Sequence, residues 1–321
     1  IKSKISETVS ETYIAKETNV SVHTVRRIID DTARLLTIKP LHDLPEHLCF
    51  DEFKSVKSSD SNMSFIICDS TTHKLVDVVR DRKSYSLKKY FHRFEPKTRL
   101  KVKTISIDMY LPYIQLIKEM FPNAKIIIDP FHIVQALNRE LNRTRVRVMN
   151  KHRYKDPKLY RKLKHYWKLI LKNPNELQNY KYSRYKLFES FITSKGIVNY
   201  ILENNPSLKN DYEVVHSLRE CIQDRDYTEF KETIEAATQL DLSPGLKRVL
   251  KTLITYLPYI QNTCEYPTRT NGPIEGINNK IKVLKRNAYG FRNYYHFRNR
   301  IILITKMFGP KQKGIKQQSV A

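Results

Sequence analysis

Runs of apolar and polar residues divide the chain into a mixed α/β part and a helical part. Short apolar runs of strand length, bounded by polar turns, predict five strands. These strands cover residues 47–53, 63–69, 75–80, 102–107 and 124–128. Apolar residues at helical spacing predict helices at 84–94 and 111–120, and a long helix from Pro130 to about residue 150. Three strands followed by alternating helices and strands indicate a mixed sheet with helices packed on it.

The first part of the chain, residues 4–31, has the pattern of a helix-turn-helix. Ser21 stands at the N-cap position of the second helix, where its hydroxyl can accept from a free backbone N–H. Apolar residues take the inner side of that helix and leave His23, Arg26 and Arg27 towards solvent, as a recognition helix presents its side chains to DNA. Three-helix units that serve only for packing share this pattern, so the sequence leaves both interpretations open.

The segment 151–265 has helical spacing throughout, and we expect it to be an insertion that contacts DNA or a second subunit. Two further helices are predicted, one around Glu275 and one over 294–307. The expected organisation is a helix-turn-helix and linker at 1–45, the first part of a sheet core at 46–150, the helical insertion at 151–265, the last helices of the core at 266–308 and a basic tail at 309–321.

The stretch from 271 to 291 predicts a helix with a marked start, because Pro273 suits the first helical position. Glu275 then lies in the first turn, and steps of three, four and seven residues place further polar side chains on its face. A carboxylate on a firmly packed helix can hold a metal ion, while Lys282 and Arg286 grip a phosphate backbone beside it. An ordinary amphipathic helix with a solvated basic face fits the same pattern.

Composition narrows the choice of partner. Lys and Arg number 58 against 33 Asp and Glu, which gives a net charge of +25 and favours a polyanionic partner such as nucleic acid. The four cysteines are far apart without C-x-x-C spacing, so we expect a reduced, cytoplasmic compartment and no structural zinc site. No long apolar run is present, and we expect no membrane partner.

Three acidic residues stand in similar settings. Asp51 interrupts the apolar first strand, Asp108 ends the fourth strand, and Glu275 opens the late helix. An unpaired carboxylate is costly to bury, and ligands of α/β sheets gather at the carboxyl ends of strands. If the first and fourth strands are neighbours, the two aspartates come together and Glu275 can be brought across them. Three such carboxylates can hold two Mg²⁺ ions for phosphodiester chemistry.

Four segments in this order carry a resemblance to a known family. They are Phe50-Asp-Glu-Phe53, Ile107-Asp-Met109, Asp129-Pro-Phe-His132 and Asn271-Gly-Pro-Ile-Glu-Gly-Ile-Asn-Asn-Lys-Ile-Lys282, followed by Gly290-Phe291. The chain resembles the bacterial insertion-sequence transposases of the ISL-three type, whose catalytic core is ribonuclease-H-like. The resemblance implies that Asp51, Asp108 and Glu275 are the catalytic and metal-binding carboxylates. It further implies two Mg²⁺ ions, with Mn²⁺ as a substitute.

The resemblance also sets the expected reaction and partners. It implies cleavage at the terminal inverted repeats of an insertion sequence and joining of the freed ends to target DNA, by a homodimer on DNA near the nucleoid. Asp129 and His132 resemble an accessory D-x-x-H motif of related transposases; a helix N-terminal histidine capped by Asp129 explains the pair equally well. The alternatives are a ribonuclease-H-like nuclease without strand transfer and a DNA-binding regulator derived from a transposase.

Overall fold

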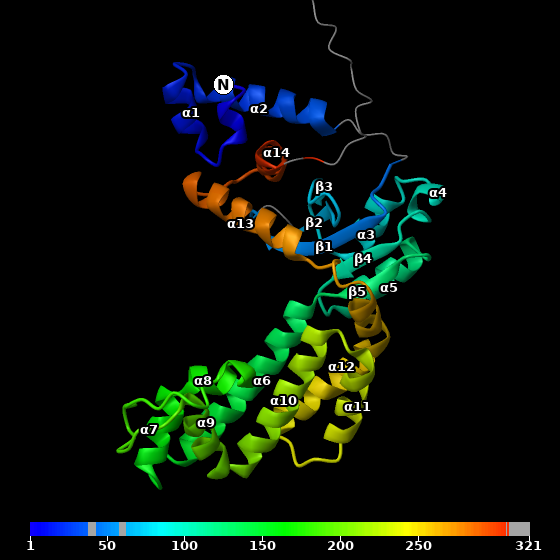
Figure 1. The fold of residues 1–321 in the computed structure, drawn as a ribbon. Helices are drawn as coiled ribbons and strands as arrows, with labels where there is room; N and C mark the ends of the chain where they lie inside the picture. Colours follow the sequence, from blue (N-terminus) through cyan, green and yellow to red (C-terminus); the bar gives the residue numbers. More distant parts are fainter. Residues whose placement is uncertain (38–42, 58–61, 306, 308–321) are drawn as a thin grey trace, which may run out of the picture. The chain divides into compact units, whose positions relative to one another are not determined.

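The chain forms two compact units in the computed structural model, which describes residues 1–37, 43–57, 62–305 and 307 (Figure 1). The sheet unit comprises residues 1–129 and 268–321, and the helical unit comprises residues 130–267. Half of the predicted linker at 40–45, residues 40–42, lies outside the described residues, and the predicted tail at 309–321 lies wholly outside them.

The sheet unit is built on a five-stranded mixed sheet in the order β3-β2-β1-β4-β5. The strands are β1 (His47–Lys54), β2 (Met63–Asp69), β3 (Leu75–Val79), β4 (Thr104–Ile107) and β5 (Lys125–Ile128). The first three strands pair antiparallel, whereas β1 pairs with β4, and β4 with β5, in parallel. The first and fourth strands are therefore neighbours, which is the condition that the expected acidic site requires, and the sheet has the ribonuclease-H-like arrangement that the resemblance implied.

Alternation along β1 assigns its side chains to two faces. On one face, Phe50 packs on Phe65 and Phe91, with ring centroids 5.1 and 5.5 Å away. This face is covered by α3 (Ser84–Phe91) and α5 (Leu111–Met120); a short helix, α4 (Pro96–Arg99), follows α3 where the sequence predicted one helix to residue 94. On the other face, Cys49 and Phe53 enter a second apolar cluster.

Two late helices, α13 (Gly272–Asn287) and α14 (Tyr294–Ile304), complete that second cluster. Helical spacing gives α13 an apolar stripe, and this stripe is buried, since Ile274, Ile277, Ile281 and Leu284 are each at most 7% exposed. Figure 1 shows α13 lying against the β1 part of the sheet. Burial of this stripe fixes which side of α13 faces the strands.

The helix-turn-helix is part of the sheet unit. After a short 3₁₀ turn, η1 (Lys4–Ser6), it consists of α1 (Glu11–Glu17) and α2 (Val22–Thr37), and Ser21 Oγ caps α2 by accepting from Thr24 N at 3.1 Å. Arg300 on α14 is fully buried and donates to the carbonyl oxygens of Ile5, Glu7 and Val9 at 2.5, 3.0 and 2.8 Å. A buried guanidinium thus fastens the segment that leads into the helix-turn-helix to α14.

The helical unit is formed by helices joined by short connections, apart from the longer segment 172–193, which contains only a short 3₁₀ turn and an isolated bridge between Ser183 and Ile192. Its elements are α6 (Pro130–Lys151), α7 (Pro157–His165), α8 (Trp167–Leu171), η2 (Pro174–Glu176), α9 (Ser194–Glu203), α10 (Pro206–Asp224), α11 (Tyr227–Ala237) and α12 (Pro244–Glu265). Thr144 Oγ1 joins α6 to α10 and α12 by hydrogen bonds with Asp211 and Ser243. The unit begins at Pro130 and therefore includes α6. The predicted insertion began at residue 151 and assigned α6 to the sheet core. Within the described residues, no helix has the length and apolar character needed to cross a membrane.

Candidate active site

Asp51 and Asp108 lie on neighbouring strands of the sheet. Asp51 is on β1 opposite Ile66, and strand alternation gives it the same face as Cys49 and Phe53, the face packed by α13. Asp108 follows the last residue of β4, the parallel neighbour of β1. Both side chains are half-buried. Glu52 points to the opposite face, where its carboxylate accepts hydrogen bonds from Tyr113 and Arg82, so the adjacent acid is engaged elsewhere.

Two asparagines connect α13 to these aspartates. Asn271 Nδ2 donates to Asp108 Oδ1 at 3.3 Å and to the carbonyl of Phe50 at 3.2 Å. Asn278 Nδ2 donates to Asp51 Oδ2 at 2.7 Å. The two asparagines are only 5% and 8% exposed. The helix is therefore held to both acidic strands by buried amide groups, and each amide fixes the orientation of one carboxylate.

Glu275 lies between these two asparagines in the sequence and on the same side of the helix. At about 100° per residue, residues 271, 275 and 278 fall within roughly 60° of one another around the α13 axis. Glu275 N donates to Asn271 O at 3.2 Å in the first turn, and its side chain is exposed. The carboxylate of Glu275 is thus accessible to solvent and belongs to the face that contacts Asp51 and Asp108.

The amide oxygens of the two asparagines lack a donor. Asn271 Oδ1 and Asn278 Oδ1 are buried without a hydrogen-bond partner within the described residues. A buried acceptor without a donor is costly, so a water molecule or ligand group at this place would complete the site. The donor set, carboxylate and amide oxygens, suits Mg²⁺, which takes one or two carboxylates and keeps several waters. The residues present therefore fit a divalent cation.

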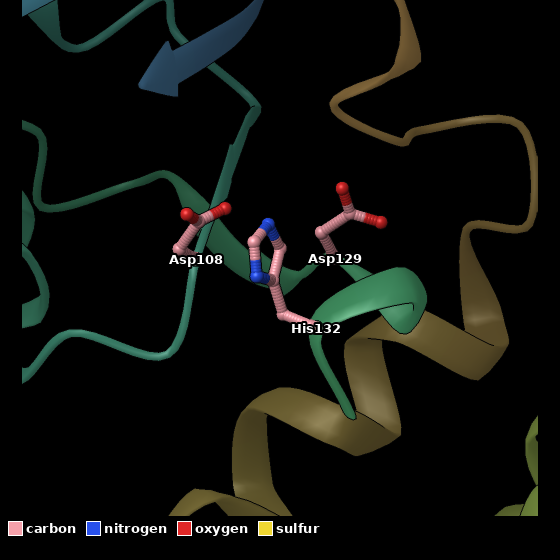
Figure 2. A group of neighbouring side chains, drawn as sticks. All are labelled: Asp108, Asp129 and His132. Carbon is pink, nitrogen blue, oxygen red and sulfur yellow. The ribbon is translucent and has the colours of Figure 1, made fainter. Parts of the chain in front are cut away.

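A further acidic group includes the predicted accessory residues. Asp108, Asp129 and His132 have ligand atoms within 4.8 Å of one another, and Figure 2 shows the imidazole between the two carboxyl groups. Asp129 follows β5, where its N–H donates to Ile107 O at 2.9 Å, and His132 is in the first turn of α6. Asp51 and Glu275 are not members of this group. Two carboxylates and an imidazole are also acceptable ligands for a divalent ion.

The predicted DNA-contacting residues lie at the surface. His23, Arg26 and Arg27 are exposed on α2, and Arg26 Nε donates to Glu11 Oε2 at 2.9 Å. Lys282 and Arg286 are exposed on α13. The sequence interpretation did not assign Asn271 or Asn278 to the site, although their spacing of four and three residues from Glu275 is the signal that identifies them.

Comparison with known proteins finds a family model and two relatives. A transposase family model of the DDE, ISL-three type matches residues 48–301. A transposase for insertion sequence element IS1001 of Bordetella parapertussis is 27% identical over 286 residues, which are 88% of this chain and 67% of that protein. No solved structure matches.

A second relative covers a smaller part of the chain. An ATP-dependent protease of Lactococcus lactis subsp. lactis is 38% identical over 112 residues, which are 35% of each protein, so the chain spans about a third of that relative. The sequence contains no G-x-x-x-x-G-K-S/T segment, the loop that cradles nucleotide phosphates in P-loop ATPases.

The family match runs from β1 to within α14 and includes Asp51, Asp108 and Glu275. Membership implies a DNA-processing enzyme that uses a divalent metal ion. The chain belongs to the ISL-three family of DDE transposases.

Proposed function

We propose that this protein cleaves the ends of an insertion sequence and joins them to target DNA, with Asp51, Asp108 and Glu275 as its catalytic carboxylates. One observation carries the proposal most directly. Asn271 and Asn278 bind Asp108 and Asp51 from the same face of α13 that bears Glu275. A helix attached in this way brings an accessible third carboxylate towards two strand-borne ones.

Two successive exchanges at phosphorus make up the reaction. In the first, a water oxygen bonds to the phosphorus at the element end, the bond from phosphorus to the 3′ oxygen breaks, and a 3′-hydroxyl is released. In the second, that hydroxyl oxygen attacks a target phosphorus, and the displaced 3′ oxygen of the target leaves with a proton. Two divalent ions held by the carboxylates would supply charge stabilisation at the attacking and leaving oxygens.

The protein's own groups bind and orient the DNA. Asn271 and Asn278 keep the aspartate side chains in one orientation, so little reorganisation is needed when the substrate arrives. Lys282 and Arg286 are exposed on α13, after Glu275, and are suited to bind phosphates on either side of the scissile bond. His23, Arg26 and Arg27 would address the protein to the element end, and a homodimer would pair the two ends.

The test uses end-labelled DNA that carries the element terminus, with Mg²⁺ or Mn²⁺. Glu275→Gln keeps the shape and removes the charge, so cleavage should fall at least about 100-fold while DNA affinity is retained. Asp51→Asn and Asp108→Asn should behave alike, and the triple variant should be scarcely slower than a single one. Glu232→Gln, an exposed acid on α11, is the matched control.

The products decide between the candidate functions. Joined product supports a transposase, cleavage alone supports a nuclease without strand transfer, and a shifted band alone supports a DNA-binding regulator. Near-normal cleavage by the Glu275→Gln protein would remove Glu275 from the site, and Asp129 would then become the leading third carboxylate because it lies beside Asp108.

A further inference from the structure

A cleft opens in the sheet unit between the helix-turn-helix and the turn that follows α13. It has a volume of about 840 Å³. Lys16 and Arg26 line it from the helix-turn-helix, and Tyr289 and Arg292 line it from residues 288–293. The cleft is therefore bordered both by the predicted recognition helix and by the end of the helix that bears Glu275.

Tyr289 is exposed to solvent and has a backbone conformation that tyrosine seldom adopts. Its side chain is 99% exposed, and its φ of 53° lies in the left-handed region. Gly290 continues the turn with a φ of 94° and donates from its N–H to Lys285 O at 2.8 Å, while Tyr289 N donates to Arg286 O at 3.1 Å. These bonds cap the end of α13, so the turn that presents the ring is fixed by the backbone.

The charge balance of the cleft favours an anionic occupant. Glu11 and Asp30 also line it, but both contact His296, at 2.5 and 3.2 Å, and Glu11 additionally pairs with Arg26. Burial lowers the pKa of His296, but its hydrogen bond with Glu11 and the charges of both acids outweigh this and raise the pKa above its usual value. The negative charges of Glu11 and Asp30 are thus compensated by neighbouring basic side chains of the protein. Lys16 is an exposed cation in the same cleft.

We propose that this cleft holds the DNA bound by α2, and that the ring of Tyr289 stacks on a base of that DNA. The proposal rests on the proposed function, because it takes DNA as the substrate. An exposed aromatic ring beside basic side chains is the combination that binds nucleic acid by stacking and phosphate contact. It follows that the recognition helix and the helix bearing Glu275 contact one DNA segment.

The length of α13 gives the position of this contact. From Glu275 to Asn287, at the C-terminal end of the helix, the rise is about 18 Å, which equals roughly five base-pair steps of straight duplex. The base that stacks on Tyr289 should therefore lie within about one helical turn of DNA from the scissile phosphate.

Site-specific photo-crosslinking tests the contact directly. The photoreactive residue benzoylphenylalanine replaces Tyr289 or, as the matched control, Tyr85, which is 77% exposed on α3 and does not line the cleft. The full chain is irradiated with a duplex that carries the element end, with divalent metal removed so that no cleavage occurs. We expect an adduct from position 289 that maps close to the cleavage site, and none from position 85.

Affinity measurements on the same duplex provide a second readout. Tyr289→Ala should weaken binding about tenfold, and Tyr289→Phe should retain it, since base stacking needs only the ring. Lys16→Gln should lower the slope of log affinity against log salt by about 0.9, whereas Lys89→Gln, an exposed lysine on α3, should leave it unchanged. Because Tyr289 is fully exposed, these variants should keep the thermal melting temperature of the parent protein.

The outcomes separate this inference from the proposed function. If the protein cleaves DNA but shows no adduct at position 289 and no loss of affinity on Tyr289→Ala, the proposed DNA contact in the cleft is refuted and the proposed transposase function is not affected. An adduct at position 289 from a protein that neither cleaves nor joins DNA supports the proposed DNA contact in the cleft and refutes the catalytic proposal. An adduct of equal yield from positions 289 and 85 indicates non-selective contact and also refutes the proposed DNA contact in the cleft.

Discussion

Replacement of Arg300 should weaken the docking of the helix-turn-helix on α14. Its guanidinium is fully buried and donates to three backbone carbonyls between Ile5 and Val9. In an Arg300→Met protein the chain length is kept, but those three acceptors lose their donor. Burial lowers the pKa of Arg300 from a very high starting value, so the side chain is still charged near neutral pH.

The size of the effect follows from the accessibility of the three acceptors. A hydrogen bond to a charged group contributes about 1.5–3 kcal/mol, and a buried acceptor left without a donor costs about 1–3 kcal/mol. Ile5 is 2% exposed, whereas Glu7 is exposed and Val9 is half-buried, so water can replace the lost donor at the latter two. Removal of a desolvated charge offsets part of the loss. We therefore expect about 3 kcal/mol, which is a change of roughly 150-fold in the docking equilibrium.

Hydrogen exchange of the α1 and α2 amides measures this docking, and urea unfolding measures the global stability. Arg300→Lys should be intermediate, because an ammonium cannot reproduce the planar fork that reaches three carbonyls. Arg27→Met, an exposed arginine on α2, is the matched control and should change neither quantity. If Arg300→Met alters docking and stability by less than about 0.5 kcal/mol, the reasoning from buried hydrogen bonds is refuted.

Four further predictions address the site, the pH dependence, DNA recognition and the helical unit. Asn278→Ala should weaken Mn²⁺ binding about 10- to 100-fold in a calorimetric titration without cleavage substrate, while the exposed neighbour Asn279→Ala should not; equal affinities would assign Asn278 to packing alone. Protonated His296 stabilises the docked helix-turn-helix, and docking raises its pKa. This stabilisation is fully present below the pKa of the unfolded state, about 6.5, and is lost as pH rises through the raised pKa. The urea midpoint of the parent protein should thus fall over that range, and a parallel fall in His296→Gln would refute the assignment. Alanine at His23, Arg26 and Arg27 together should reduce selectivity for end DNA over scrambled DNA by about 1–3 kcal/mol per lost base contact, and unchanged selectivity would exclude α2 as the reader. Neutralising lysines between 151 and 172 should flatten the salt dependence of binding by about 0.9 per phosphate contact, and an unchanged slope with an unchanged oligomeric state would leave this segment a packing role.

Local patterns determined much of the fold. The strands β1 and β2 and the helices α5 and α6 lie within two residues of their predicted ends, because alternation and helical spacing of apolar residues depend only on neighbours along the chain. Periodicity also accounts for two structural observations: Glu52 points to the face opposite Asp51, and the apolar stripe of α13 lies on its buried side. Where the local signal was weaker, the ends shifted, as where α3 stops at Phe91 and a separate helix begins at Pro96.

Tertiary contacts decided the rest, because they join residues whose separation in sequence carries no local signal. Asn271 reaches Phe50 and Asp108, and Asn278 reaches Asp51, across 163 to 227 positions. The sequence predicted three catalytic carboxylates, and spacing alone could have placed the two amides near Glu275, but their contacts with Asp108 and Asp51 follow only from the packing of α13 beside β1 and β4. Likewise, the sequence predicted a helix-turn-helix with a linker, and only the folded structure showed that motif joined to α14, through contacts such as that of Arg300 with Ile5, 295 positions away. Periodicity reports which side of an element is buried, whereas the partner that covers it depends on long-range packing of the folded chain.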